Sequence, residues 1–314
     1  MARLGDICTR ITDGSHNPPQ GISHSEYLML SSKNIYDDEI TLDDPRFLSA
    51  ENYETENKRT QISTGDILLT IVGTVGRAAV VPNSIKNICL QRSVAVIKPK
   101  SDLVDSRFLM YQLQSMRTQL EQEARGVAQK GIYLKQVENL QIKVPSLDEQ
   151  LRVVKKLDKV SKLIALRKEQ LTKLDQLVKS RFIELFGDPV YNNNGLPTKK
   201  LCELGSLDRG RSQHRPRNDP KLLNGPYPLI QTGEVASAGL YITEYKNTYS
   251  ELGLQQSKMW KAGTLCITIA ANIAQTAILT FDACFPDSVV GFVPNDAVSA
   301  IYMHYWFGFF QKIL

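Results

Sequence analysis

The residues best suited to chemistry in this sequence are basic and amide side chains in one short segment. Residues 209–217 read RGRSQHRPR and hold four arginines, one histidine and no acidic residue. Gly210 and Pro216 disfavour regular structure, so a loop is expected. Arginine contacts phosphates and guanine edges, and serine and glutamine also bond to bases. The segment therefore indicates nucleic-acid contact, with a plain solvated loop as the alternative. The contact residues expected here are Arg209, Arg211, Gln213, His214, Arg215 and Arg217.

Motifs for catalysis are incomplete wherever they begin. Residues 17–20 read NPPQ, and the amino-methyltransferase motif that they approach needs a fourth, aromatic residue to stack a flipped base. Residues 244–246 read EYK but lack the preceding Pro-Asp pair of a nuclease. Residues 73–77 read GTVGR and lack the Gly-Lys-Ser/Thr of a phosphate-binding loop. We therefore expect a non-catalytic protein that needs no cofactor.

Cysteines and histidines show neither disulfide nor metal-ligand spacing. The five cysteines are scattered without a C-x-x-C pair, and the four histidines are far apart. The sequence starts without an apolar signal segment, and no apolar run is long enough to cross a bilayer. These features predict a protein with reduced thiols, no metal and no membrane contact, in the cytoplasm. The net charge of +5 only hints at an acidic partner.

The sequence contains two diverged copies of one domain. Residues 64–80, TGDILLTIVGTVGRAAV, align with residues 262–278, AGTLCITIAANIAQTAI, so that Thr70 matches Thr268. An internal repeat of this kind predicts two similar domains in one chain. The other matched segments are 4–7 with 204–207, 89–99 with 284–294, and 108–111 with 302–305.

Each copy has the pattern of an α+β domain. Residues 66–72 and 93–97 are short apolar runs, rich in β-branched residues and bounded by glycine, proline or asparagine, as strands are. A helical pattern follows at 106–122. We therefore expect a small curved sheet with a helix appended to it in each copy.

Polar residues next to the expected strands are further candidates for nucleic-acid contact. Their side chains are of the types that read guanine and adenine, and they differ between the copies while the strands are retained. Readers of two different sequences need such divergence, although drift of surface loops also produces it. In the first copy they are Lys33, Asn34, Thr74, Arg77, Gln91 and Arg92. In the second copy they are Gln231, Thr232, Asn272 and Gln275.

A long helix is predicted between the copies. Ser146 to Glu149 form a capping box, Gly187 is a stop signal, and nothing between them breaks a helix. About 40 residues at ~1.5 Å each make a rod roughly 60 Å long. Apolar residues at seven-residue spacing predict pairing with a second helix, and the alternative is a helix lying on its own domain. The pairing positions are Leu157, Val160, Ile164, Leu171, Leu174, Val178 and Leu185.

This arrangement resembles the specificity subunits, called HsdS, of type I restriction-modification enzymes. Residues 139–145, NLQIKVP, and 147–150, LDEQ, are similar to the start of that family's first conserved helix. Residues 180–189, SRFIELFGDP, are similar to its end. Residues 214–220, HRPRNDP, and 227–234, YPLIQTGE, resemble a common second target-recognition domain. The resemblance covers essentially the whole chain.

The resemblance implies both a fold and a function. The fold is α+β, with target-recognition domains at 1–145 and 189–314 separated by a coiled-coil-type spacer helix at 146–188. Each domain would read one half of a bipartite site in double-stranded DNA. The helix would set the spacing and dock methyltransferase (M) subunits, and a separate restriction (R) subunit would cut the DNA.

One element of the family is expected to be missing. The second copy stops at Leu314, which matches Leu120 in the first, whereas the family continues into a second conserved helix. Helix 147–186 is then expected to pair in trans with a second chain, or the sequence is an inactive truncated product. The rival from another class is a dimeric DNA-binding regulator, but two unlike copies in one chain favour an asymmetric reader.

Overall fold

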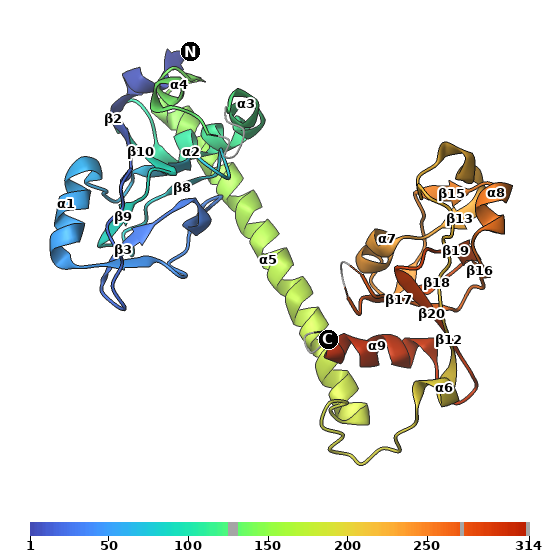
Figure 1. The fold of residues 1–314 in the computed structure, drawn as a ribbon. Coiled ribbons are helices and arrows are strands. Elements are labelled where there is room, and N and C mark those ends of the chain that lie inside the picture. The colour runs from blue at the N-terminus through green and yellow to red at the C-terminus, as the bar shows by residue number, and fades with distance from the viewer. Residues whose placement is uncertain (125–130, 271–272, 312–314) are drawn as a thin grey trace. The chain divides into compact units, whose positions relative to one another are not determined.

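The computed structural model describes residues 1–124, 131–270 and 273–311, and it divides into two compact units (Figure 1). Unit 1 is Met1–Leu166 and unit 2 is Arg167–Leu314. Both units combine sheets with helices, so the predicted α+β class is confirmed. The boundary between the units falls inside the long helix, so each unit includes one half of it.

Unit 1 contains a four-stranded antiparallel sheet, in the order β2-β10-β7-β8, and a three-stranded sheet, β6-β3-β9. Its strands are β1 (Ala2–Arg3), β2 (Cys8–Asp13), β3 (Tyr27–Leu30), β4 (Ile35–Tyr36), β5 (Glu39–Ile40), β6 (Arg46–Leu48), β7 (Ile67–Thr70), β8 (Ala78–Val80), β9 (Ile88–Leu90), β10 (Val94–Pro99) and β11 (Gln141–Ile142). Its helices are η1 (Leu4–Ile7), η2 (Ser32–Asn34), α1 (Ala50–Thr60), α2 (Ser106–Ser115), α3 (Arg117–Glu123) and α4 (Leu134–Glu138).

Unit 2 contains a five-stranded sheet, β12-β20-β17-β18-β14, and a four-stranded sheet, β15-β13-β19-β16. Its strands are β12 (Gly205–Arg209), β13 (Leu223–Leu229), β14 (Tyr241–Ile242), β15 (Asn247–Tyr249), β16 (Met259–Trp260), β17 (Leu265–Thr268), β18 (Thr276–Leu279), β19 (Ala283–Cys284) and β20 (Val289–Pro294). Its helices are α6 (Leu201–Leu204), η3 (Pro220–Leu222), α7 (Thr232–Ser237), α8 (Glu251–Gln255) and α9 (Ala300–Phe310).

The central strands are apolar because both faces of their sheet are covered. In β7, Ile67 and Leu69 belong to a core cluster with Leu109 of α2, while Leu68 belongs to a second cluster with Leu30 of β3. Successive residues of a strand point to opposite faces, so a strand covered on both sides is apolar throughout. The continuous apolar runs in the sequence are therefore explained by this burial.

The two units are copies of one topology, as the sequence repeat predicts. The order β2-β10-β7-β8 recurs as β12-β20-β17-β18, and the parallel pair β3–β9 recurs as β13–β19. The Thr70 hydroxyl accepts from the Arg77 N–H at 2.9 Å, and the Thr268 hydroxyl accepts from the Gln275 N–H at 3.1 Å. Both threonines are fully buried and fasten the same hairpin. The repeat is confirmed down to this hydrogen bond.

The structure shifts one segment of the predicted repeat by three residues. The Lys100 N–H donates to the Ile7 carbonyl, and the Asn295 N–H donates to the Leu204 carbonyl in the same place. Lys100 and Asn295 each follow the last proline of the central strand, β10 or β20. Residues 4–7 therefore correspond to 201–204 and not to 204–207. The Leu-Gly pair at 204–205 was misleading, because Gly205 already lies in β12.

The long helix α5 (Leu147–Phe186) has the ends that the sequence predicts. At its start the Ser146 hydroxyl accepts from the Glu149 N–H at 3.4 Å. After its end Gly187 adopts a φ of +80°, a left-handed conformation that glycine takes without strain. Val154 of α5 is buried in unit 1 and Phe182 in unit 2, while the residues between them are mostly exposed.

A single glutamine fastens the start of α5 to unit 1. Gln150 is fully buried, and its side-chain oxygen accepts from the Asp105 N–H at 2.9 Å. Its amide nitrogen donates to the carbonyls of Leu103 and Pro145 at 3.0 and 2.9 Å. One amide thus satisfies three backbone groups that flank the starts of α2 and α5, which gives a physical role to the glutamine of the LDEQ motif.

Replacing Gln150 with alanine leaves these backbone groups without their partner, and we expect a loss of about 2 kcal/mol or more in the stability of unit 1. Both tryptophans, Trp260 and Trp306, lie in unit 2. In urea unfolding of Gln150→Ala, the part of the circular dichroism that reports on unit 1 should therefore be lost at a lower urea concentration than in the unsubstituted chain. The tryptophan fluorescence, which reports on unit 2, should change at the same urea concentration as before. The control Gln170→Ala, on the exposed part of α5, should shift neither transition; equal effects of the two variants would refute the role of Gln150.

Candidate nucleic-acid interface

The predicted arginine-rich segment leaves the sheet of unit 2 at a glycine. The Gly210 N–H donates to the Val289 carbonyl at 2.8 Å, and a side chain on Gly210 would place its Cβ 2.3 Å from the Pro286 carbonyl oxygen. The corresponding Gly14 of unit 1 would place a Cβ 2.1 Å from the Leu90 carbonyl oxygen. Only glycine lets the chain cross its neighbour this closely, so both units send a loop out at the same point.

Asp287 organises the arginines of this loop. Its carboxylate accepts from Arg217 at 2.5 Å and lies 3.7 Å from the Arg215 guanidinium, and its backbone carbonyl accepts from Arg209 Nε. For Arg211, by contrast, the described residues provide no acidic partner, and its side chain is exposed. The loop therefore has a defined shape and one guanidinium available for an anion.

A second contact shapes the middle of the loop. The Gln256 side-chain oxygen accepts from the N–H groups of Gln213 and His214 at 2.7 and 3.1 Å. The His214 ring lies 3.1 Å from the Asp219 carboxylate. The hydrogen bond from the Lys221 N–H lowers the pKa of that carboxyl most, and the contact with His214 lowers it further. Gln213 and His214 are thus exposed residues on an ordered loop.

A polar hollow joins this loop to the beginning of α7. Arg217, Gln231 and Thr232, all predicted contact residues, line the same hollow. Sequence reasoning missed three further polar residues there, Asn218, Asn247 and Ser288. Asn247 comes from β15, and its closeness depends on strand pairing that no local motif reveals. The hollow combines hydroxyl, amide and guanidinium groups, the chemistry that binds base edges and phosphates.

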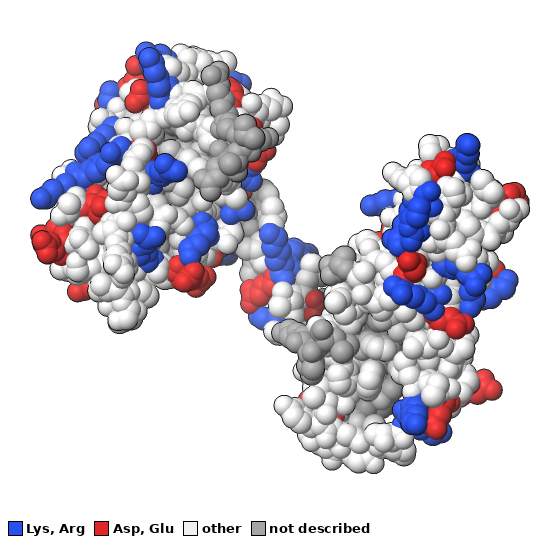
Figure 2. Space-filling view, in the orientation of Figure 1, with Lys and Arg blue, Asp and Glu red and all other residues white. Residues whose placement is uncertain are grey.

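Basic side chains gather unevenly over unit 2. In Figure 2, Lys and Arg lie mainly over the end that carries β13, β15 and α8 in Figure 1, with acidic residues among them. The opposite end, around α9, is largely uncharged in this view. The overall charge of +5 thus hides an uneven distribution of basic side chains over unit 2.

In unit 1 the structure places the two neighbouring predicted residues Lys33 and Asn34 in different environments. Lys33 is exposed and paired with Asp44, and the hydrogen bond from Lys33 lowers the pKa of that carboxyl. Asn34 is 1% exposed; its oxygen accepts from the Ser31 N–H, and its nitrogen donates to the Asp43 carbonyl. Asn34 is therefore corrected from a base-reading candidate to a residue that holds its own turn together.

Three of the other candidates of unit 1 line two depressions. Thr74 and Arg77 line one together with Arg117, and the Arg77 guanidinium lies 5.0 Å from the centre of the Tyr36 ring. Arg92 lines the other with Arg59. Gln91 is half-exposed beside Arg92, and its N–H donates to the Leu30 carbonyl.

The depression at Arg92 contains groups that sequence reasoning missed. Asp13, at the end of β2, is paired with Arg59 of α1 and lies 2.7 Å from the His16 ring. Arg59 comes from a helix without a recognisable motif, so only the fold brings it here. By strand register Asp13 corresponds to Arg209, and Arg92 corresponds to Asp287. The charges at this pair of positions are exchanged between the units.

Gln275, another predicted residue of unit 2, belongs neither to the arginine-rich segment nor to the hollow. Gln275 lines a separate pocket with His304 of α9 and Lys179 of α5. Asn272 lies outside the described residues. Across the described part of the chain there is no group of three or more His, Cys, Asp and Glu side chains placed to hold a metal ion. The helices that the structure describes also include none long and apolar enough to cross a membrane.

Comparisons with known proteins agree with this architecture. The family model described as "Type I restriction modification DNA specificity domain" matches residues 3–176, more than half of the chain. The type I restriction enzyme EcoBI specificity subunit of Escherichia coli is 35% identical over 128 residues, which are 40% of this chain. The match spans only 27% of that relative's length.

Solved structures show the same fold over the whole chain. The type I restriction-modification system S subunit from M. genitalium aligns with 99% of this chain and 77% of its own, at a TM-score of 0.55 and 12% identity. A structure that addresses complex assembly and conformational transition of the type I R-M system aligns with 99% of this chain and 79% of its own, at a TM-score of 0.54 and 17% identity.

If Asp287 organises the arginine loop, Asp287→Ala should loosen it without unfolding unit 2. The half-exposed ion pairs contribute about 1 kcal/mol at most, which is about a fivefold change in the open population. Limited trypsin digestion should then cleave after Arg211 and Arg217 about fivefold faster. The control Asp282→Ala removes the ion pair with Lys261 outside the loop and should leave these cleavage rates unchanged; equal acceleration in both variants would contradict the assignment.

Proposed function

Because this chain belongs to the family of type I restriction-modification DNA specificity domains, we propose that it is a non-catalytic specificity subunit that binds double-stranded DNA. Residues 1–145 and 189–314 act as two readers, and residues 146–188 connect them. Each reader recognises one half of a bipartite site. In this role the chain works in the cytoplasm, and the methylation and cleavage chemistry belongs to partner subunits.

The observation that carries this proposal is one scaffold with two different polar surfaces. The strand order and the crossing glycines Gly14 and Gly210 are shared by the units. Beside each glycine the charged residues differ: Asp13 and Arg92 in unit 1 stand where Arg209 and Asp287 stand in unit 2. A protein that reads two unlike half-sites needs a common frame and divergent contact residues.

In unit 2 the chemistry of DNA binding divides between two groups of residues. Arg211 has no acidic partner among the described residues and is suited to a phosphate, which supplies affinity without sequence information. Gln231, Asn218 and Asn247 of the hollow carry amides that bond to adenine or other base edges. Affinity and sequence preference are therefore expected to respond to different substitutions.

The long helix supplies the surface for protein partners. Several apolar side chains of α5 are more than half exposed, including Ile164 at 51%, Leu171 at 63% and Leu174 at 56%. An apolar stripe of this kind marks an interaction surface. We propose that α5 pairs in trans with a helix of a second chain and that methyltransferase subunits dock on it, with the restriction subunit joining through them.

Arg211→Ala tests the DNA contact. If Arg211 neutralises one phosphate, the slope of the logarithm of the binding constant against the logarithm of salt concentration should fall by about 0.9, with weaker binding at low salt. Fluorescence anisotropy with a random-sequence duplex at several salt concentrations measures both quantities. The control Arg181→Ala removes an exposed arginine of α5 that is paired with Glu184. An unchanged slope for Arg211→Ala would show that the loop does not contact DNA.

Substitution of Ile164 and Leu171 by lysine tests the pairing of α5. Burying a Leu or Ile contributes about 1.5–3 kcal/mol, so two charges in the stripe should abolish association and leave a monomer or a poorly soluble chain. Light scattering gives the mass. The control pair Ala165→Lys and Thr172→Lys adds the same charge at exposed positions outside the seven-residue repeat. If the unsubstituted chain is already a monomer at high concentration, self-pairing is excluded.

A further inference from the structure

The first turns of α5 are attached to unit 1 by polar contacts at two points. At the first point, the buried Gln150 bonds to the backbone at the start of α2. At the second point, Asp158 accepts hydrogen bonds from Arg107 and Tyr111 of α2. The eight residues between the two points span about 12 Å along a helix axis. Two fixed points determine the direction of a rigid rod, whereas one point alone lets it swing.

Arg107 is the centre of the second attachment. Its two terminal nitrogens donate to the two carboxylate oxygens of Asp38 at 2.8 and 2.7 Å. Its Nε and Nη2 also donate to Oδ1 of Asp158, at 3.0 and 2.7 Å. The Tyr111 hydroxyl donates to the same oxygen at 2.8 Å and lies 3.4 Å from the Ser161 hydroxyl. These five residues are called here the Arg107 clamp.

Asp38 joins the Arg107 clamp to the main sheet of unit 1. It lies in the tight turn between β4 and β5, and its N–H donates to the Ala78 carbonyl of β8 at 3.0 Å. Two parallel hydrogen bonds between a guanidinium and a carboxylate fix the plane of the guanidinium. The hydrogen bonds with Asp38 are the main reason why the pKa of Arg107 is raised above its ordinary value. The charged Arg107 is thus held by the sheet and in turn holds α5.

The residues of α5 that are not exposed recur with helical spacing. The structure describes α5 throughout, and from Leu147 to Arg181 only Gln150, Val154, Asp158 and Ser161 are not exposed. Residues at this spacing lie on one face of a helix. Two of the four belong to the Arg107 clamp, and residues 162–181 beyond them are all exposed. The clamp is therefore the contact of unit 1 that lies farthest along α5.

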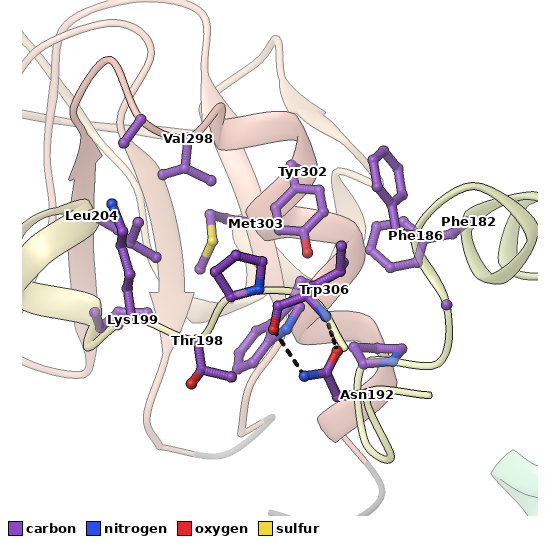
Figure 3. A pocket seen from close by; sticks show the side chains of 16 residues that line it. Phe182, Phe186, Asn192, Thr198, Lys199, Leu204, Val298, Tyr302, Met303 and Trp306 are labelled. Atoms are coloured by element: carbon purple, nitrogen blue, oxygen red, sulfur yellow. Dashed lines mark hydrogen bonds between the residues drawn. The ribbon is translucent and has the colours of Figure 1, made fainter. Parts of the chain in front are cut away.

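The frame that the two units share does not require this arginine. In α9 the position of Arg107 is taken by Ile301, which is 43% exposed. The end of α5 meets α9 through aromatic rings instead: Phe186 lies beside Tyr302 in Figure 3, with the ring centres 5.1 Å apart. Apolar contacts are non-directional, whereas hydrogen bonds weaken steeply when they are tilted. The Arg107 clamp is thus a directional attachment that unit 1 has and the α9 contact lacks.

We propose that the Arg107 clamp fixes the direction in which α5 leaves unit 1 and thereby sets how strictly the chain selects the spacing between two DNA half-sites. This inference rests on the proposed function, because spacing matters only if both units read DNA. One additional base pair moves the half-sites ~3.4 Å apart and rotates them by about 35° around the duplex. A chain that follows this change has to bend or twist, and bending at unit 1 breaks the bonds of the clamp.

The strength of the clamp limits the size of the effect. Half-exposed ion pairs contribute about a fivefold factor at most in an equilibrium. Arg107→Ala removes this cost for a site with the wrong spacing, and it changes little for the correct spacing, where the clamp stays closed. Because an equilibrium shifts only by the difference between two states, the preference for the correct spacing should fall by about fivefold.

Competition between duplexes tests the spacing role. The target of the unsubstituted chain is first located by mapping methylated adenines after expression with the methyltransferase subunit. Duplexes with this target, or with one base pair added to or removed from its spacer, then compete for the purified complex in fluorescence anisotropy. Arg107→Ala should lower the preference about fivefold. Asp158→Asn, a milder change, should act in the same direction, and Arg107→Lys should lie between, because an ammonium cannot form the paired bonds.

The control variant is Lys98→Ala. It removes the ion pair with Asp66 in unit 1 and touches no residue of the clamp. A merely destabilised unit 1 weakens binding at all spacings alike, so this variant should keep the preference. An unchanged preference in Arg107→Ala, or an equal loss in Lys98→Ala, would overturn the proposal.

A measurement without DNA separates the clamp from the proposed function. Spin labels are placed at Glu54→Cys of α1 and Gln170→Cys of α5, both exposed, in a chain with Cys202→Ser, since the other four cysteines are buried. The distribution of distances between the labels should be broader in Arg107→Ala than in Lys98→Ala. An equally narrow distribution would refute the clamp whatever the DNA result. A broader one in a chain that directs no methylation would refute the proposed function and the spacing role together.

Discussion

The close crossing of the chain at Gly14 and Gly210 is the constraint on which the candidate surface depends. At each point a strand leaves the main sheet across a backbone carbonyl too near for any side chain, at 2.1 Å and 2.3 Å from an added Cβ. Because the chain crosses there, the loop after the first strand meets the loop before the central strand. The arginines of residues 209–217 can therefore reach Asp287. In unit 1 the acid beside the crossing, Asp13, is instead paired with Arg59 of α1.

The exchanged charges around this crossing explain how two units with the same strand order can have different surfaces. Each unit places one acid and one base at the same two positions, in opposite order: Asp13 with Arg92, and Arg209 with Asp287. In unit 2 the Asp287 carboxylate is shared by two arginines and its backbone carbonyl accepts from a third, so the loop stays strongly positive. In unit 1 the carboxylate of Asp13 is held by Arg59 and His16. The local electrostatic field thus differs between the two units although their strand order is the same.

The strands, the helix bounds and the repeat could be predicted because their signals are local. The apolar runs at 66–72 and 93–97, the cap at Ser146 and the stop at Gly187 act within a few residues. The arginine loop was also visible, because its composition is unusual. The repeat was misaligned by three residues because two short apolar segments, 201–204 and 204–207, both resemble residues 4–7. Only the hydrogen bond from the Asn295 N–H to the Leu204 carbonyl shows that 201–204 is the equivalent segment.

What sequence reasoning missed depends on partners far away in the chain. Asp287 lies about 70 positions from the arginines that it holds, and Gln150 lies 45 positions from Asp105. Asn34 has the side-chain type of a base reader, but its turn uses both of its amide atoms. Side-chain type and spacing therefore indicate the chemistry that is available, whereas burial and long-range bonds decide which residues are free to use it.

The central claim is that the two units, which share one strand order, read DNA independently of each other. A chimera tests this claim most directly. Residues 1–145 are replaced by the first domain of another specificity subunit, with Gln150 and its partners at Leu103 and Asp105 matched so that α5 stays fastened. The chimera and the parent chain are each expressed with the methyltransferase subunit, and methylated adenines are mapped by single-molecule sequencing. The account predicts that one half of the bipartite site changes and the other is retained; a change in both halves, or in neither, would contradict it.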